Sequence, residues 1–257
     1  MEPARHLEII RAEGVSVAAT PVDALGASIP TVAEWTVEGV VRHLGKVHQW
    51  VTTILALSPG QALDEAGPLP GMPKGPDCLA AYAESHAAMV AAFEGLDPDE
   101  ERVNFGGAGT VGWWMRRQAQ ETSVHRIDVA DGVHAAGGPT PEALPADAAA
   151  DGIDEWARFF LAVRWPQRNG ALPEDLHGRT IHIHGTDDPA PADGAEWLLS
   201  LGADGIDIEA THAKGDVALR GSSSDLLLAL WRRRSLDDLD VVGDRSVAER
   251  LLDVARF

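Results

Sequence analysis

The sequence contains one cysteine, Cys78, and this scarcity limits the chemistry that the chain can perform alone. A single thiol excludes an internal disulfide framework and agrees with a reducing compartment. A predicted helix start could lower the pKa of this thiol, but a plain small residue is the simpler interpretation. Any thiol chemistry is therefore expected to use a small-molecule thiol from outside the chain.

Positive charge is also scarce. The 257 residues include 21 lysines and arginines against 40 acidic residues, and the resulting formal charge of −19 is spread along the chain. Nucleic acids and anionic membrane surfaces bind proteins through a basic face, which this sequence does not supply. We therefore expect neither a nucleic-acid partner nor a membrane partner.

Long apolar runs and a targeting segment are absent as well. No run reaches the roughly 20 residues that span a bilayer, and the first residues lack the basic and apolar regions of a signal peptide. With 45% hydrophobic and 24% charged residues, the composition is that of an ordinary globular protein. The sequence predicts a cytoplasmic protein that is a monomer or a small homo-oligomer.

Helix signals dominate the first half of the chain. Thr36 and Asp77 are candidate N-caps, Gly132 is a candidate C-terminal cap, and the glycine-rich stretch 106–109 is typical of a loop. Four helices without a persuasive strand predict an up-and-down bundle. Their expected ranges are 4–26, 36–57, 77–95 and 110–131.

The pattern changes after residue 150, where alternating strands appear between helices. The chain is therefore predicted to be α+β, with a four-helix bundle over 1–135, a linker over 136–149 and a small α+β domain over 150–257. The elements expected in this domain are helices at 151–164, 223–233 and 245–256 and strands at 179–185, 205–210, 216–221 and 239–242.

A polar stripe follows one face of the fourth predicted helix. Glu121 and His125 lie one turn apart on this stripe, so both side chains can bind the same ion. In the second helix His43 interrupts an apolar row, and a buried imidazole there needs a partner. Two histidines and one carboxylate would leave a fourth position open, as in catalytic zinc sites. The stripe consists of Trp114, Gln118, Glu121, His125 and Asp128.

Spacing alone leaves a second interpretation open. Glu121 and His125 could form a surface pair, and His43 could be a hydrogen-bonded core histidine. Gln118 and Asp128 could orient a ligand or simply bond within the bundle. His48 lies off the face of His43 and is expected at the surface or between helices. The neighbouring arginines are expected to lie on the solvated surface; they are Arg116, Arg117 and Arg126.

Two features of the second half carry weaker signals. His182 and His184 alternate with isoleucines and could chelate a metal, but no third ligand is evident and a half-exposed strand is the favoured interpretation. The segment from Arg220 to Asp225 joins a strand to a helix, where its serines suit either an anion site or helix capping.

Three stretches of the sequence together resemble the mycothiol-dependent maleylpyruvate isomerase family, within the DinB-like metalloenzyme group. They are AEWTVEGVVRHLGKVHQWV, WWMRRQAQETSVHRIDVADG and VALRGSSSDLLLALWRRR. The resemblance implies a DinB-like bundle whose second and last helices supply His43, Glu121 and His125 as ligands of a divalent metal, taken to be zinc. It also implies a C-terminal α+β domain and mycothiol as cosubstrate.

The resemblance further implies an enzyme, either an isomerase or a thiol S-transferase, that acts on a small maleylpyruvate-like electrophile. Arg220 is then a candidate catalytic residue for a substrate carboxylate, and Asp128 is a second candidate beside the metal. Two alternatives stay open: a non-enzymatic metal-binding module, and metal-dependent hydrolysis with Asp128 as general base.

Overall fold

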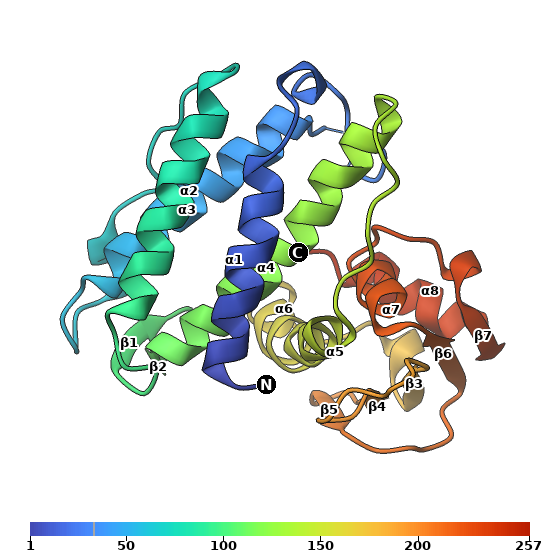
Figure 1. The fold of residues 1–257 in the computed structure, drawn as a ribbon. Helices are drawn as coiled ribbons and strands as arrows, with labels where there is room; N and C mark the ends of the chain where they lie inside the picture. The colour runs from blue at the N-terminus through green and yellow to red at the C-terminus, as the bar shows by residue number, and fades with distance from the viewer. Residues whose placement is uncertain (33) are drawn as a thin grey trace. The chain divides into compact units, whose positions relative to one another are not determined.

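The computed structural model describes residues 1–32 and 34–257, which form two compact units, Met1–Glu142 and Ala143–Phe257 (Figure 1). No helix among these described residues has the length and apolar character needed to cross a bilayer. The domain boundaries expected from the sequence, 1–135 and 150–257, stay a prediction.

The described residues of the first unit form a bundle of four α-helices, drawn in Figure 1. Helix α2 packs against α3 and α4, and α1 packs against the same two helices. Their shared core is apolar and includes Val40, Leu44 and Tyr82, each with no exposed surface. The four helices are α1 (Pro3–Ala18), α2 (Val37–Leu55), α3 (Asp77–Glu94) and α4 (Val111–Ala135), and short 3₁₀ turns follow α1 and α2 at η1 (Val22–Ala24) and η2 (Leu63–Ala66).

Threonine hydroxyls begin the two helices that carry the predicted ligands. Thr36 accepts a hydrogen bond from the Gly39 amide at 3.1 Å, and Thr110 accepts one from the Trp113 amide at the same distance. Each bond satisfies an amide that has no partner within its own helix. The start of α2 and the start of α4 are thereby fixed.

Two expected caps are wrong. Asp77 is the first residue of α3, and the N-cap position belongs to Pro76. Gly132 lies inside α4, where an added Cβ would stand 2.5 Å from Val37 Cγ2. The glycine is therefore needed because α4 approaches the start of α2 closely, a tertiary contact that the sequence pattern does not reveal.

The loop expected at 106–109 is also wrong. Strands β1 (Glu101–Asn104) and β2 (Gly107–Thr110) form an antiparallel hairpin just before α4, and the Asn104 side chain accepts a hydrogen bond from the Gly106 amide in its turn. Glycines have no side chains that could alternate between faces, so the sequence pattern gives no strand signal here.

The second unit contains a five-stranded sheet in the order β5-β4-β3-β6-β7. The strands are β3 (Arg179–Gly185), β4 (Glu196–Leu201), β5 (Ile206–Glu209), β6 (Val217–Gly221) and β7 (Asp240–Gly243). Only β3 and β6 run parallel. The helical elements are α5 (Ala146–Glu155), the π-helical segment η3 (Trp156–Arg164), α6 (Trp165–Asn169), α7 (Ser223–Leu230) and α8 (Arg245–Val254), with 3₁₀ turns η4 (Glu174–Leu176) and η5 (Leu236–Asp238).

One face of this sheet is apolar and covered. Ile181 and Ile183 of β3 are buried, and a Cβ on Gly185 of the same face would meet the Ser223 hydroxyl of α7. Helices α7 and α8 both pack on β3 and β6. Strand β4 was not predicted, but the α+β class, with a helical bundle followed by a small α+β unit, is confirmed.

Candidate metal centre

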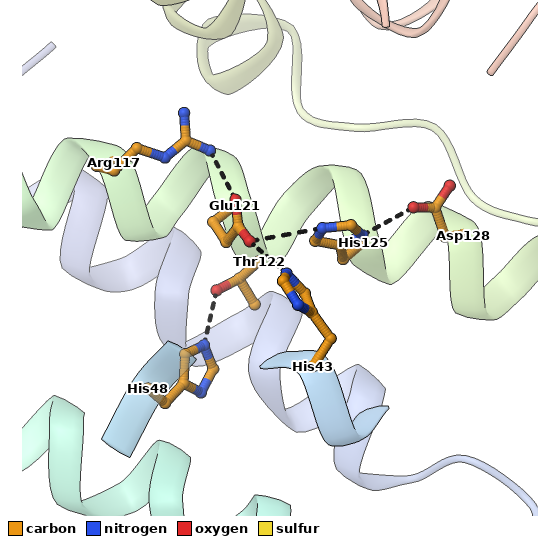
Figure 2. Close-up of polar contacts among 7 residues, drawn as sticks. All are labelled: His43, His48, Arg117, Glu121, Thr122, His125 and Asp128. Atoms are coloured by element: carbon orange, nitrogen blue, oxygen red, sulfur yellow. Dashed lines mark hydrogen bonds and ion pairs between the residues drawn. The ribbon is translucent and has the colours of Figure 1, made fainter. Parts of the chain in front are cut away.

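The three residues predicted as metal ligands converge between α2 and α4 (Figure 2). His43 Nε2 lies 3.0 Å from Glu121 Oε1, and His125 Nε2 lies 3.5 Å from the same oxygen. The three candidate donor atoms all lie within 4.8 Å of one another. The structure thus places the residues from the two helices together, around a point that one ion could occupy.

The donor set fits a divalent transition metal. Tetrahedral zinc with bonds of about 2.1 Å holds its donor atoms about 3.4 Å apart, close to the two distances at Glu121. Imidazole nitrogens and a carboxylate oxygen are ordinary zinc ligands. Three protein ligands would leave one coordination position for a small molecule.

Asp128 fixes the ring of His125. Its carboxylate is 1% exposed and accepts a hydrogen bond from His125 Nδ1 at 2.8 Å. This bond leaves the lone pair of a neutral ring on Nε2, the atom that faces Glu121. In the metal-free chain, burial opposes protonation, but the bonds to Asp128 and Glu121 outweigh it and raise the pKa of His125 to about 9.

Arg117 holds the other oxygen of Glu121. The guanidinium lies 3.1 Å from Glu121 Oε2 and is 5% exposed, so its expected place on the solvated surface is wrong. Burial favours the neutral acid, but bonds to His125 and His43 and the charge of Arg117 hold the pKa of Glu121 well below its ordinary value. The carboxylate therefore stays ionised and keeps Oε1 directed at the histidines.

Arg126 is a second correction of the same kind. It is 8% exposed, and its guanidinium pairs with the Glu13 carboxylate and donates to the Glu142 carbonyl at 2.6 Å. Burial of an arginine requires such partners, because an unpaired charge is costly inside a protein. Arg116 is half-buried.

Trp35 forms an aromatic wall of the site. Its ring stacks on His125 at an interplanar angle of 4° and meets the edge of His43 at a centroid distance of 5.1 Å. The cluster is nevertheless open to solvent, since the His43 side chain is 29% exposed and that of His125 13%. Both imidazoles are therefore only partly covered by the bundle.

Several other polar side chains of the bundle lie in its interior. His48 lies between helices, where Nε2 is 3.3 Å from the Thr122 hydroxyl, and burial lowers its pKa to about 3 (Figure 2). Gln118 is 1% exposed. Cys78 is fully buried, and burial raises the pKa of its thiol. The helix start does not activate this cysteine.

The second unit holds Arg220 and the serines that follow it. The Arg220 side chain is 45% exposed and pairs with Asp240 at 3.4 Å. Ser222 caps α7 by accepting a hydrogen bond from the Asp225 amide, and the Ser223 amide donates to Asp187 at 3.0 Å. Capping and an internal carboxylate thus account for this helix start, which leaves no need for an external anion.

The fold and the cluster together define a class of protein. Its members have a helical bundle with a histidine–carboxylate cluster between two helices, followed in the chain by a small α+β unit. The model of the mycothiol maleylpyruvate isomerase N-terminal domain matches residues 8–130, and that of the MDMPI C-terminal domain matches residues 147–250. Together they span most of the chain. The chain therefore belongs to the mycothiol-dependent maleylpyruvate isomerase family.

Solved structures show the same fold. A crystal structure of a mycothiol-dependent maleylpyruvate isomerase matches with a TM-score of 0.56 and 12% identity, over 94% of this chain and 93% of that chain. A histidine-to-alanine mutant with that description matches over the same shares with a TM-score of 0.57 and 12% identity. No match to this chain was found among curated proteins.

Proposed function

We propose that this chain is a metalloenzyme that uses a low-molecular-weight thiol, mycothiol, to isomerise or to thiolate a small electrophile resembling maleylpyruvate. The observation that carries the proposal is the convergence of His43 and His125 on one oxygen of Glu121. Membership of the family and the description of its structural neighbours supply the thiol and the substrate class.

His43, Glu121 and His125 would hold the divalent ion, with zinc the metal that their nitrogen and oxygen donors suit best. A bound ion of this kind lowers the pKa of a thiol beside it and so supplies a thiolate near neutral pH. The chain's only cysteine is buried with a raised pKa, which supports a thiol from outside.

The residues around the three ligands would orient them and limit their contact with water. Asp128 keeps the His125 lone pair on the ring nitrogen that faces the site, and Arg117 keeps Glu121 ionised with one oxygen free to bind. Trp35 covers one face of the His125 ring and makes a T-shaped contact with His43, so it limits the approach of water on that side. These contacts fix the donors before a ligand arrives, which favours binding in one geometry.

The reaction itself is a reversible addition. The thiolate sulfur forms a bond to one carbon of the substrate double bond, and the displaced electron pair moves into the conjugated carbonyl. The carbon–carbon bond is then single and rotates. Return of the electron pair restores the double bond and expels the thiolate, so the cosubstrate is regenerated. If the neighbouring carbon instead takes up a proton, the same addition ends as S-transfer.

Arg220 is proposed to bind a carboxylate of the substrate, since a guanidinium pairs with carboxylates through two parallel bonds. Asp128 is better suited to position His125 than to act as a general base. Its carboxylate is 1% exposed and already bonded to the ring. This environment weakens the hydrolytic alternative, in which Asp128 would have to accept a proton from water.

The experiment measures bound metal and activity together. Wild-type protein, His43→Ala and His134→Ala, a control at an exposed histidine, are analysed for zinc and assayed with mycothiol and maleylpyruvate. We expect metal-dependent and mycothiol-dependent turnover that only His43→Ala loses. Wild-type protein that binds metal but gives neither isomerisation nor thiol transfer would refute the enzymatic proposal and favour the binding module.

A further inference from the structure

Four polar side chains of the second unit meet on the face of the sheet opposite Ile181 and Ile183. His182 and His184 project from β3 on the side opposite Ile181 and Ile183. Glu196 of β4 is the direct cross-strand neighbour of His184. The fourth member, His212, comes from the segment between β5 and β6.

The topology explains how His212 reaches the other three residues. Strand β5 lies at one edge of the sheet, and β6 lies beyond β4 and β3, so residues 210–216 must cross both strands. Asp216 anchors the end of this crossing, because its carboxylate accepts hydrogen bonds from the Thr180 amide at 2.7 Å and hydroxyl at 3.0 Å. The segment thus carries His212 onto the face that holds the histidine pair.

The three imidazoles converge on a single oxygen of Glu196. His182 Nε2 lies 3.1 Å and His184 Nδ1 lies 3.4 Å from Glu196 Oε2, and His212 Nδ1 forms a short contact with the same oxygen. The contacts from His182 and His212 are hydrogen bonds, and they use the two lone pairs of the Glu196 oxygen, so His184 is left with a close approach to the carboxylate but no hydrogen bond to it. Hydrogen bonding therefore does not account for the whole cluster.

A metal ion would satisfy all four groups. Their donor atoms lie within 4.8 Å of one another, and separations of 3.1 and 3.4 Å match the edge of about 3.4 Å expected for tetrahedral zinc. The three rings stand almost perpendicular to one another, with interplanar angles of 78°, 79° and 90°. Such rings can direct nitrogen lone pairs at one point from different sides.

The surroundings leave room for an ion. The three histidines line a pocket of about 330 Å³, together with Lys214 and Arg220. Arg220 pairs with Asp240 at 3.4 Å, which offsets part of the positive charge next to the cluster. Neutral imidazoles and the Glu196 carboxylate would supply the donors and one negative charge.

We infer that His182, His184, His212 and Glu196 form a second metal site, separate from the bundle cluster and specific for a zinc-like divalent ion. Four protein ligands fill a tetrahedral shell, which is the pattern of a structural site. The ion would tie residues 210–216 to β3 and β4. The bound ion would then link β3, β4 and the segment 210–216 to one another.

The test is a zinc titration of the full chain after metal removal, in competition with a chromophoric chelator. His212 is the variant of choice because its side chain is 73% exposed, so His212→Ala should leave the fold intact. His134→Ala removes another exposed histidine as the matched control. We expect two equivalents of zinc in the wild type and the control, and one in His212→Ala.

His43→Ala distinguishes zinc binding at this site from zinc binding at the bundle cluster. It should keep one equivalent, and adding His212→Ala should weaken that binding by more than about 100-fold, since even outer partners of a metal contribute about 10- to 100-fold. One equivalent in the wild type that His212→Ala loses and His43→Ala keeps would support this site and contradict the bundle site. Equal zinc binding by His43→Ala and the double variant would overturn the second site.

Hydrogen exchange gives an independent measure. Zinc should slow amide exchange across residues 210–216 in the wild type and in His43→Ala, but not in His212→Ala. Unchanged exchange on addition of zinc to the wild type would also overturn the inference, because a bound ion must restrain the segment that supplies one of its ligands.

Discussion

Replacement of Asp128 by asparagine tests how the bundle site is held together. The new side chain would have nearly the same shape but no charge, and its amide group can turn its NH₂ toward His125 Nδ1. This arrangement favours the tautomer that carries its proton on Nε2, the atom that must bind the metal. We therefore expect Asp128→Asn to weaken zinc binding by about 10- to 100-fold, or about 1.4 to 2.7 kcal/mol.

The pH dependence of this loss follows from the charge on His125. In the metal-free wild type the pKa of His125 is raised to about 9, so near neutral pH an incoming ion must displace a proton. Asp128→Asn removes a carboxylate that stabilises the protonated His125 ring, so it also reduces the competition between the proton and zinc. The difference in affinity between wild type and variant should therefore widen as the pH rises from about 7 to about 9.

Chelator competition at several pH values measures both effects, and nuclear magnetic resonance of the ring protons follows the pKa of His125 directly. Asp204→Asn, which removes the same charge at an exposed turn, is the matched control. Equal zinc affinity of Asp128→Asn and wild type at pH 9, with an unchanged pKa of His125, would refute the positioning role of Asp128.

Three further predictions concern single residues. The folded chain holds the pKa of His48 near 3 against an ordinary value of 6.5, so the unfolded chain binds this proton first as the pH falls. The stability that this group contributes is fully present above pH 6.5, and about 2.7 kcal/mol of it should be lost by about pH 4.5; urea unfolding should show this loss in wild type but not in His48→Gln. Cys78 should react with a thiol reagent only when the protein unfolds, and Cys78→Ala should keep its thiol-dependent turnover; rapid labelling of the native protein would contradict this. Arg220→Ala should raise KM for a carboxylate substrate by about 10- to 100-fold, the equivalent of one charged hydrogen bond, with the zinc content of the bundle site and kcat little changed. A fall in kcat alone would exclude a role for Arg220 in substrate binding.

Helical periodicity in the sequence was enough to predict much of the bundle site. It placed Glu121, His125 and Asp128 on one face of α4 and identified His43 as an exception in an apolar row. It could not show that α2 and α4 lie side by side, because the pattern within one helix contains no information about its neighbour. That step came from the resemblance to a family.

The residues that support the site were harder to predict. Arg117 precedes Glu121 by four residues, so the spacing of a salt bridge was present, but its position off the polar stripe suggested the solvated surface. Trp35 precedes a helix cap, where the sequence gives no direction for its ring. Both contacts depend on how loops and helices meet in three dimensions.

The second cluster was missed for a related reason. The paired leucines of β4, Leu198 and Leu199, interrupt the polar–apolar alternation, so neither the strand nor Glu196 was predicted. His212 lies in an irregular segment far along the chain from His182. Without sheet order, the HxH pattern of β3 had no third ligand.

Calorimetric titration of mycothiol tests the central claim most directly. The titration compares zinc-loaded wild type, metal-free wild type and zinc-treated His43→Ala. We expect saturable binding of mycothiol to the zinc-loaded wild type alone, since the thiol would need the open position beside His43, Glu121 and His125. Equal binding to all three samples, or none to the zinc-loaded wild type, would contradict it.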